Sequence, residues 1–181
     1  MDIGRVFPQS FDVSDTDSEE FKDFHEDFKF TFVVAFLKSV EQQPVSFTKT
    51  NFEKVTIAVA IVERRVNVLS GRLFNELQSS LQFSPHELDI VSDLMYEHLS
   101  KSNVVIDLTR TSFYRPLQKR FADVAPSHLK EVVSQTLIQL RDLIGEKQFS
   151  LTDTRNLWII KPGASSRGRG IEIHSDINEI V

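Results

Sequence analysis

The chain has 181 residues, a formal net charge of −5 and no cysteine. Hydrophobic residues make up 40% of it, enough for a buried core. The acidic balance excludes a nucleic-acid binder that relies on bulk positive charge, and the missing cysteine excludes disulfides, thiolate zinc sites and thiol nucleophiles. No apolar run approaches the roughly 20 residues of a membrane span and the first residues do not resemble a signal peptide, so we expect a cytosolic protein.

The first predicted element is a long helix in an acidic, phenylalanine-rich segment. Its phenylalanines recur at helical spacing, at positions Phe21, Phe24, Phe28, Phe32 and Phe36. A start near Asp17 or Ser18 places carboxylates in the first turns, where they suit the positive end of the helix dipole, and Pro44 bounds the helix. We interpret the acidic residues as a solvated helix face, in preference to a partner contact or a cation site.

Three further helices are predicted before the C-terminal segment. The second begins at about Asn51, the third has a capping box formed by Ser84 and Glu87, and the fourth follows Pro126 and stops at Gly145. Apolar residues at helical spacing predict the buried positions of the second and fourth helices, namely Val55, Ala58, Val59, Val62, Val66, Leu69, Leu129, Val132, Val133, Leu137 and Leu140.

Two shorter features lie between the third and fourth helices. The stretch from Val104 to Leu108 alternates in polarity, which is typical of a short strand. The stretch from Thr109 to Arg120 is locally basic and could meet an acidic partner, but we interpret its cations as residues of a solvated loop. The five histidines show no spacing typical of metal ligands, and no metal site is predicted.

The C-terminal segment carries the strongest functional signal. The apolar run from Leu157 to Ile160 predicts a strand buried on both faces, and Lys161 follows it directly. The next residues offer backbone amides, hydroxyls and guanidinium groups to an anion, at Gly163, Ser165, Ser166, Arg167, Gly168, Arg169 and Gly170. Their spacing fits neither a Walker A loop nor a dinucleotide fingerprint. By spacing alone, a phosphate-holding loop and an ordinary glycine-rich hairpin both remain open.

The run from Trp158 to Ile171 resembles the nucleotide-binding signature of the tubulin tyrosine ligase-like enzymes, which are amino-acid ligases with an ATP-grasp fold. Here it reads Trp-Ile-Ile-Lys-Pro and then Ser-Arg-Gly-Arg-Gly-Ile, most similar to the glycine-adding branch. Some glutamate-adding members carry nearly the same second half. The resemblance implies ATP and Mg²⁺ as cofactors, and it implies nucleotide contacts from Lys161, Ser166, Arg167, Gly168, Arg169 and Gly170.

The same resemblance implies a function for the parent protein. It would be a tubulin glycylase that adds glycine to glutamate side chains of tubulin tails, in the cytoplasm, on the cytoskeleton and in the cilium. Its partners would be tubulin, ATP and glycine, with no nucleic acid. A tubulin polyglutamylase is the alternative enzyme. A non-catalytic helical interaction module with a residual nucleotide-binding loop is the alternative from another class.

The predicted fold is α+β, with a helical region over residues 1–150 and the first strand–loop–strand of an ATP-grasp core over residues 151–181. The resemblance places the magnesium ligands and catalytic residues beyond Val181. We therefore expect an incomplete and inactive core, with no catalytic residue identified in this chain. Asp176 and Glu179 are predicted to open a further helix as a capping pair.

Overall fold

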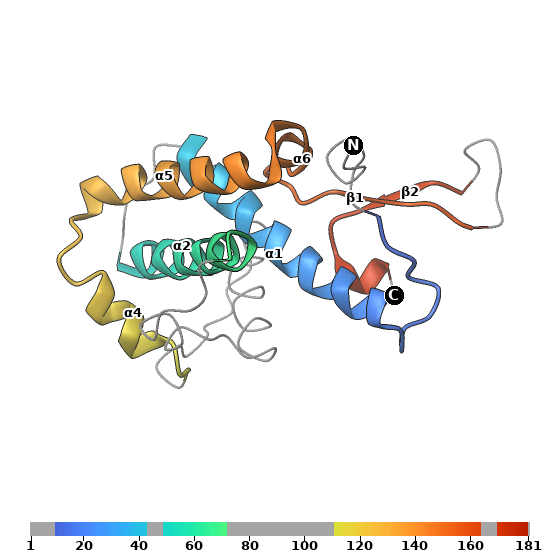
Figure 1. Ribbon diagram of the computed structural model, residues 1–181, viewed down its shortest axis with the longest axis horizontal. Helices are drawn as coiled ribbons and strands as arrows, with labels where there is room; N and C mark the ends of the chain where they lie inside the picture. Colours follow the sequence, from blue (N-terminus) through green and yellow to red (C-terminus); the bar gives the residue numbers. More distant parts are fainter. Residues whose placement is uncertain (1–9, 43–48, 72–110, 164–169, 181) are drawn as a thin grey trace.

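The computed structural model describes residues 10–42, 49–71, 111–163 and 170–180. Helices α1, α2 and α5 contact one another pairwise, and a small antiparallel hairpin lies to the right of α2 and α5, over the start of α1 (Figure 1). In chain order the elements are α1 (Glu19–Gln42), α2 (Lys49–Leu69), α4 (Tyr114–Arg120), α5 (Pro126–Ile144), α6 (Glu146–Leu151), β1 (Trp158–Ile160), β2 (Glu172–His174) and the 3-10 helix η4 (Ile177–Glu179). The helices together with the two-stranded sheet confirm the predicted α+β class. The ATP-grasp core and the division at residue 150 stay predictions.

Helix α1 begins where its sequence predicts. The Ser18 hydroxyl accepts the Phe21 backbone N–H at 3.0 Å, which satisfies one of the free donors at the helix start. Glu19 and Glu20 occupy the first turn, where their charge suits the helix dipole. The helix ends at Gln42, and Pro44 lies outside the described residues.

Helices α2 and α5 pack the predicted apolar faces against α1. All their predicted core positions are buried except Val132, which is half-buried, and Leu69, which is 49% exposed. The prediction for Leu69 is wrong because it is the last residue of α2 and, with the exposed Val68 before it, lies outside the core.

The basic segment is a helix, which corrects the solvated loop expected from its charge. Phe113 is fully buried, and Leu117 and Phe121 follow at helical spacing with exposures of 3% and 6%. These apolar anchors hold α4 against the core, while Arg115 and Lys119 are exposed. Arg110, the predicted third helix around Ser84, and the predicted strand at Val104 to Leu108 lie outside the described residues.

Two ion pairs fasten α2 to its neighbours. The Arg65 guanidinium lies 3.2 Å from the Asp27 carboxylate of α1, and Arg120 of α4 pairs with Glu63. Burial raises the pKa of both carboxyls, and the arginines only partly oppose this shift. The attraction within each pair therefore offsets only part of the cost of burying its carboxylate.

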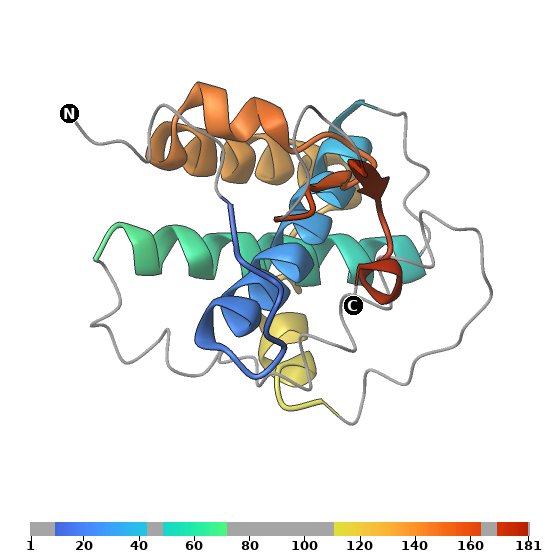
Figure 2. The same ribbon diagram turned by 90° about the vertical axis from the view of Figure 1, so that its right-hand side faces the viewer.

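The hairpin packs on the N-terminal half of α1. Figure 2 views the molecule from the side of the hairpin. The Trp158 ring meets Phe24 edge-on at 5.2 Å between centroids and stacks on Phe28 at 5.7 Å. Phe11, from the segment before α1, completes this aromatic cluster at 6.2 Å from Trp158. The cluster joins residues that are far apart in the sequence into one hydrophobic core.

The prediction that β1 is buried on both faces is wrong. Ile159 is 60% exposed, and its cross-strand partner Ile173 is 62% exposed. Successive side chains of a strand point to opposite faces, so Trp158 and Ile160 turn inward while Ile159 turns outward. One face of the hairpin packs on α1, and no layer of described residues covers the other.

Within the described ranges, no helix is long and apolar enough to cross a membrane.

Candidate functional site

Lys161 and Gly170 lie at the same end of the hairpin. The antiparallel register pairs Ile160 with Glu172, so Lys161 follows the last pair on one strand and Gly170 precedes the other strand by two residues. Lys161 is exposed. The hairpin thus carries a cation at the point where the loop leaves the sheet.

The two ends of this loop approach each other at Pro162 and Gly170, which we call the neck of the loop. Gly170 has a backbone conformation there that requires glycine. Its φ is +74°, in the left-handed region. A Cβ atom added there would lie 3.0 Å from Cγ of Pro162, at the other side of the neck. Pro162 and Gly170 therefore face each other in close contact.

The structure describes only part of the predicted nucleotide site. Lys161 and Gly170 come together at the neck of the loop, whereas Ser166, Arg167, Gly168 and Arg169 lie outside the described residues. The nucleotide-binding role of all six residues stays a prediction. In the described part of the chain, no group of three side chains suited to a metal ion comes together.

The far end of the hairpin holds a histidine between two carboxylates. Nδ1 of His174 lies 3.0 Å from Glu179, and Nε2 lies 3.0 Å from Glu172. Hydrogen bonds to Glu179 and then to Glu172 raise the pKa of the imidazole above its usual value. The sequence predicted a capping pair here. Asp176 does accept the Asn178 N–H at 2.9 Å, but Glu179 binds His174 instead, and the turn is a short 3-10 helix.

This triad predicts a pH dependence for the link between β2 and η4. Because the folded pKa of His174 is raised, the stabilisation is fully present below the unfolded value of about 6.5 and is lost as pH rises through the folded pKa. NMR titration of the His174 ring should show a pKa above 6.5, and Glu179→Gln should lower it. An unshifted pKa in the unaltered chain would contradict the triad.

Sequence analysis missed a buried lysine on α1. Lys38 is 8% exposed, and its ammonium donates to the backbone oxygens of Phe149, at 2.5 Å, and Thr152. The same ammonium lies 3.7 Å from the centroid of the Phe149 ring. Burial lowers the pKa of Lys38, opposed in part by Asp153, Glu146 and Glu41. Its position inside the apolar stretch of α1 was the only signal available.

Sequence analysis also missed a buried asparagine before β1. Asn156 is 3% exposed and has a φ of 50°, a left-handed conformation that asparagine tolerates better than most residues. Its side-chain amide donates to the Phe28 backbone oxygen of α1 at 3.3 Å. Its side-chain oxygen accepts the indole N–H of Trp158 at 3.3 Å.

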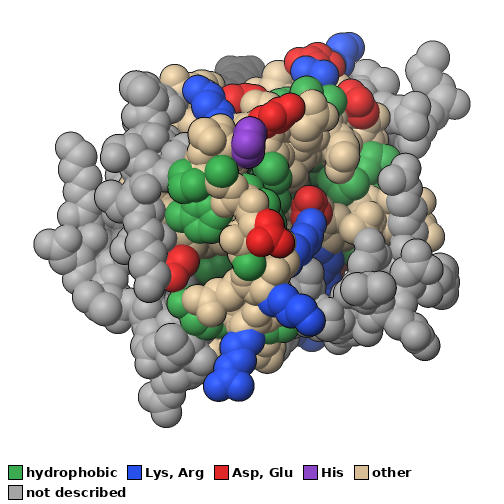
Figure 3. Space-filling view, turned by 90° about the vertical axis from the view of Figure 1, so that its left-hand side faces the viewer, with side chains coloured by type: hydrophobic (Ala, Val, Ile, Leu, Met, Phe, Trp, Pro, Cys, Tyr) green, Lys and Arg blue, Asp and Glu red, His purple; other side chains and the backbone are tan. Residues whose placement is uncertain are grey.

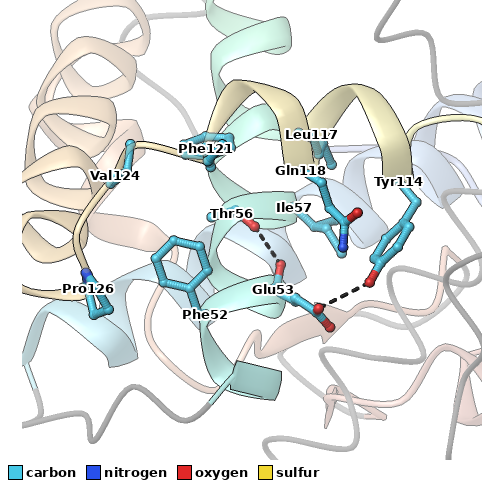
Figure 4. Close-up of a pocket in the computed structure, with 11 residues that line it drawn as sticks. Phe52, Glu53, Thr56, Ile57, Tyr114, Leu117, Gln118, Phe121, Val124 and Pro126 are labelled. Atoms are coloured by element: carbon cyan, nitrogen blue, oxygen red, sulfur yellow. Dashed lines mark hydrogen bonds between the residues drawn. The ribbon is translucent and has the colours of Figure 1, made fainter.

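A cavity of about 550 Å³ lies between α2, α4 and the start of α5 (Figure 4). Its walls are mostly apolar, and its polar groups include Glu53, which accepts the Tyr114 hydroxyl at 3.1 Å. The described residues that line it include no lysine, no arginine and no part of the hairpin. This described part of the lining therefore offers a phosphate no cationic partner.

Figure 3 shows the end of the molecule opposite the hairpin, where basic and acidic side chains are interspersed with hydrophobic ones. Among the described residues, this face carries no broad surface of one charge.

Comparison with known proteins gives two matches. The model of a family described as "Tubulin-tyrosine ligase family" matches residues 75–181, which include the whole hairpin and its loop. The chain is also 24% identical, over 231 aligned residues, to tubulin glycylase 3D of Tetrahymena thermophila. That alignment covers 99% of this chain and 22% of the relative, so the chain spans about a fifth of the length of the curated relative it matches. No solved structure matches the chain.

Proposed function

The chain belongs to the tubulin-tyrosine ligase family, and we propose that it forms part of an ATP-dependent ligase that adds an amino acid to tubulin. We propose glycine as that amino acid, on the support of the similarity to a tubulin glycylase. Residues 151–181 would open the nucleotide-binding core, and residues 1–150 would form the helical region before it. The cytoskeleton, and in particular the cilium, would be the place of action.

The observation that carries this proposal is the hairpin geometry. Lys161 leaves β1 as an exposed cation, and the loop that follows begins and ends at a neck closed by Pro162 and Gly170. A lysine beside a loop rich in backbone amides is a ready site for phosphate groups. Lys161 would contact the nucleotide, and Ser166, Arg167, Gly168, Arg169 and Gly170 would cover its phosphates.

The described residues fit a phosphate and leave the metal ligands unassigned. When bound, ATP would supply the phosphoryl group that activates a carboxylate for attack by an amine. The part of this chain would be to orient the phosphates and to neutralise their charge through Lys161 and the loop arginines. We assign no Mg²⁺ ligand to the described residues, because they bring no three suitable side chains together.

Substitution of Lys161 tests the nucleotide site. Lys161→Ala should weaken ATP binding at least tenfold, measured by isothermal titration calorimetry, because it removes a cation that directly precedes the neck. Tenfold corresponds to about 1.4 kcal/mol of binding free energy. The matched control is Lys147→Ala, which removes an exposed lysine from α6 and should leave ATP affinity unchanged. Failure of the unaltered chain to bind ATP, or equal affinity in both variants, would contradict the proposal.

The choice of amino acid needs a separate test. An extended protein that includes this chain should incorporate labelled glycine into tubulin in an ATP-dependent manner. Incorporation of glutamate in its place would favour the polyglutamylase. Absence of both, with ATP binding retained, would favour a helical interaction module.

A further inference from the structure

We propose that helix α1 positions β1, and with it Lys161, through two buried polar contacts, made at Lys38 and at Asn156. The two contacts fix the segment that runs from α6 into β1, and β1 carries Lys161. The N-terminal helical region would then support the nucleotide site directly, and it would not be an independent domain. The inference rests on the proposed function only for its nucleotide-binding readout.

The first contact fixes the end of α6. The last carbonyl groups of a helix have no partner within the helix and need one from outside. The Lys38 ammonium supplies donors to the Phe149 and Thr152 oxygens from within the core, with the Phe149 ring against it. A positive charge also suits the negative end of the helix dipole. Residue Thr152, where α6 stops, is therefore held against α1.

The second contact fixes the entry into β1. Asn156 makes a single left-handed turn in the backbone and is buried while doing so. Its amide contacts two neighbours at once, the Phe28 oxygen of α1 and the Trp158 indole N–H of β1. Loss of the side chain would leave the indole N–H without this acceptor in a half-buried setting, which is unfavourable.

Apart from the packing of Trp158 on Phe24 and Phe28, the hairpin has little else to define its position. Its strands have three residues each, and an isolated two-stranded hairpin is marginally stable in water. The outward face, with Ile159 and Ile173, is exposed. Lys161 follows Asn156 by five positions along a largely extended chain, so the direction set at Asn156 determines where the lysine lies.

The decisive experiment compares Asn156→Gly with Leu129→Val in the same 181-residue chain. Glycine tolerates the positive φ, so this variant removes the amide contacts without straining the backbone. Leu129 is fully buried in α5, and its shortening lowers overall stability away from the hairpin. Each variant is measured by ATP titration, by urea unfolding and by hydrogen exchange of the backbone amides.

We expect Asn156→Gly to weaken ATP binding at least tenfold, and Leu129→Val to change it less than twofold at a similar loss of stability. Hydrogen exchange should accelerate selectively in β1 and β2 of Asn156→Gly, with α2 and α5 unchanged. Lys38→Met, which keeps the length of the side chain and removes the ammonium, should accelerate exchange in the same strands.

The outcomes separate this inference from the proposed function. Unchanged ATP affinity in Asn156→Gly, with binding by the unaltered chain, overturns the inference and leaves the function standing. If the unaltered chain does not bind ATP, the proposed function is contradicted. Hydrogen exchange alone then tests whether α1 positions the hairpin. Selective loss of protection in the hairpin then supports positioning by α1, and uniform loss overturns it. If Asn156→Gly does not fold, Lys38→Met takes its place in the same comparison with Leu129→Val.

Discussion

Phe24→Ala is expected to lower the free energy of unfolding by about 3–5 kcal/mol, the range found when a buried aromatic side chain is cut to alanine. Phe24 is 1% exposed and contacts rings from three parts of the chain. Its centroid lies 5.8 Å from Phe11, 6.0 Å from Phe28 and 5.2 Å from Trp158. Its loss leaves a void where α1, the hairpin and the preceding segment meet.

Urea unfolding followed by circular dichroism measures this loss, since the midpoint and slope together give the free energy. A domain has only about 5–15 kcal/mol of stability in all, so the variant should be close to unfolded at elevated temperature. Phe21→Ala is the matched control, because Phe21 lies on the same helix and is only half-buried. Equal losses in both variants would show that the aromatic cluster is not the centre of packing.

Gly145→Ala is the second substitution with a large expected effect, a loss of about 1–3 kcal/mol. Gly145 separates α5 from α6 and has φ 87° and ψ 149°, a conformation that is essentially restricted to glycine. A Cβ atom there would meet nothing within 4 Å, so the cost comes from the backbone alone. The junction would have to rearrange, and α6 would move away from Lys38.

Thermal and urea unfolding of Gly145→Ala give the loss of stability. The comparison is Gly163→Ala, a glycine without a positive φ and also without neighbours within 4 Å of an added Cβ. That variant should be neutral or slightly stabilising, because alanine has less freedom than glycine in the unfolded chain. A neutral result for Gly145→Ala would mean that the junction adopts another conformation in solution.

Long helices with repeated apolar positions could be predicted from the sequence because their signals are local. The start of α1 at Ser18 and the stop of α5 at Gly145 follow from residues that act on their own backbone. Helix α4 has seven residues and α6 has six, too few for a periodic pattern to emerge. The segment around α4 was therefore interpreted from its charge, and its three buried apolar residues, Phe113, Leu117 and Phe121, were not recognised as a helix face.

The site could be predicted only in part, because its support comes from distant residues. The apolar run, the glycines and the alternating segment were enough to place Lys161 and Gly170 at one end of a hairpin. The contacts of Lys38 with Phe149 and of Asn156 with Phe28 join residues 111 and 128 positions apart in the sequence. No local pattern encodes such pairs. The exposure of Ile159 depends likewise on what packs against the sheet, which the strand alone does not specify.

Helix α1 meets different neighbours along its 24 residues. Phe24 and Phe28 near its start face the hairpin, whereas Lys38 near its end faces α6. Each residue added to an α-helix turns everything after it by about 100°. One residue inserted between Phe28 and Lys38 would rotate these two contacts out of phase, although it would change no side chain. The number of residues between Phe28 and Lys38 is thus constrained as well as their identity, because it sets the angle between the contact with the hairpin and the contact with α6.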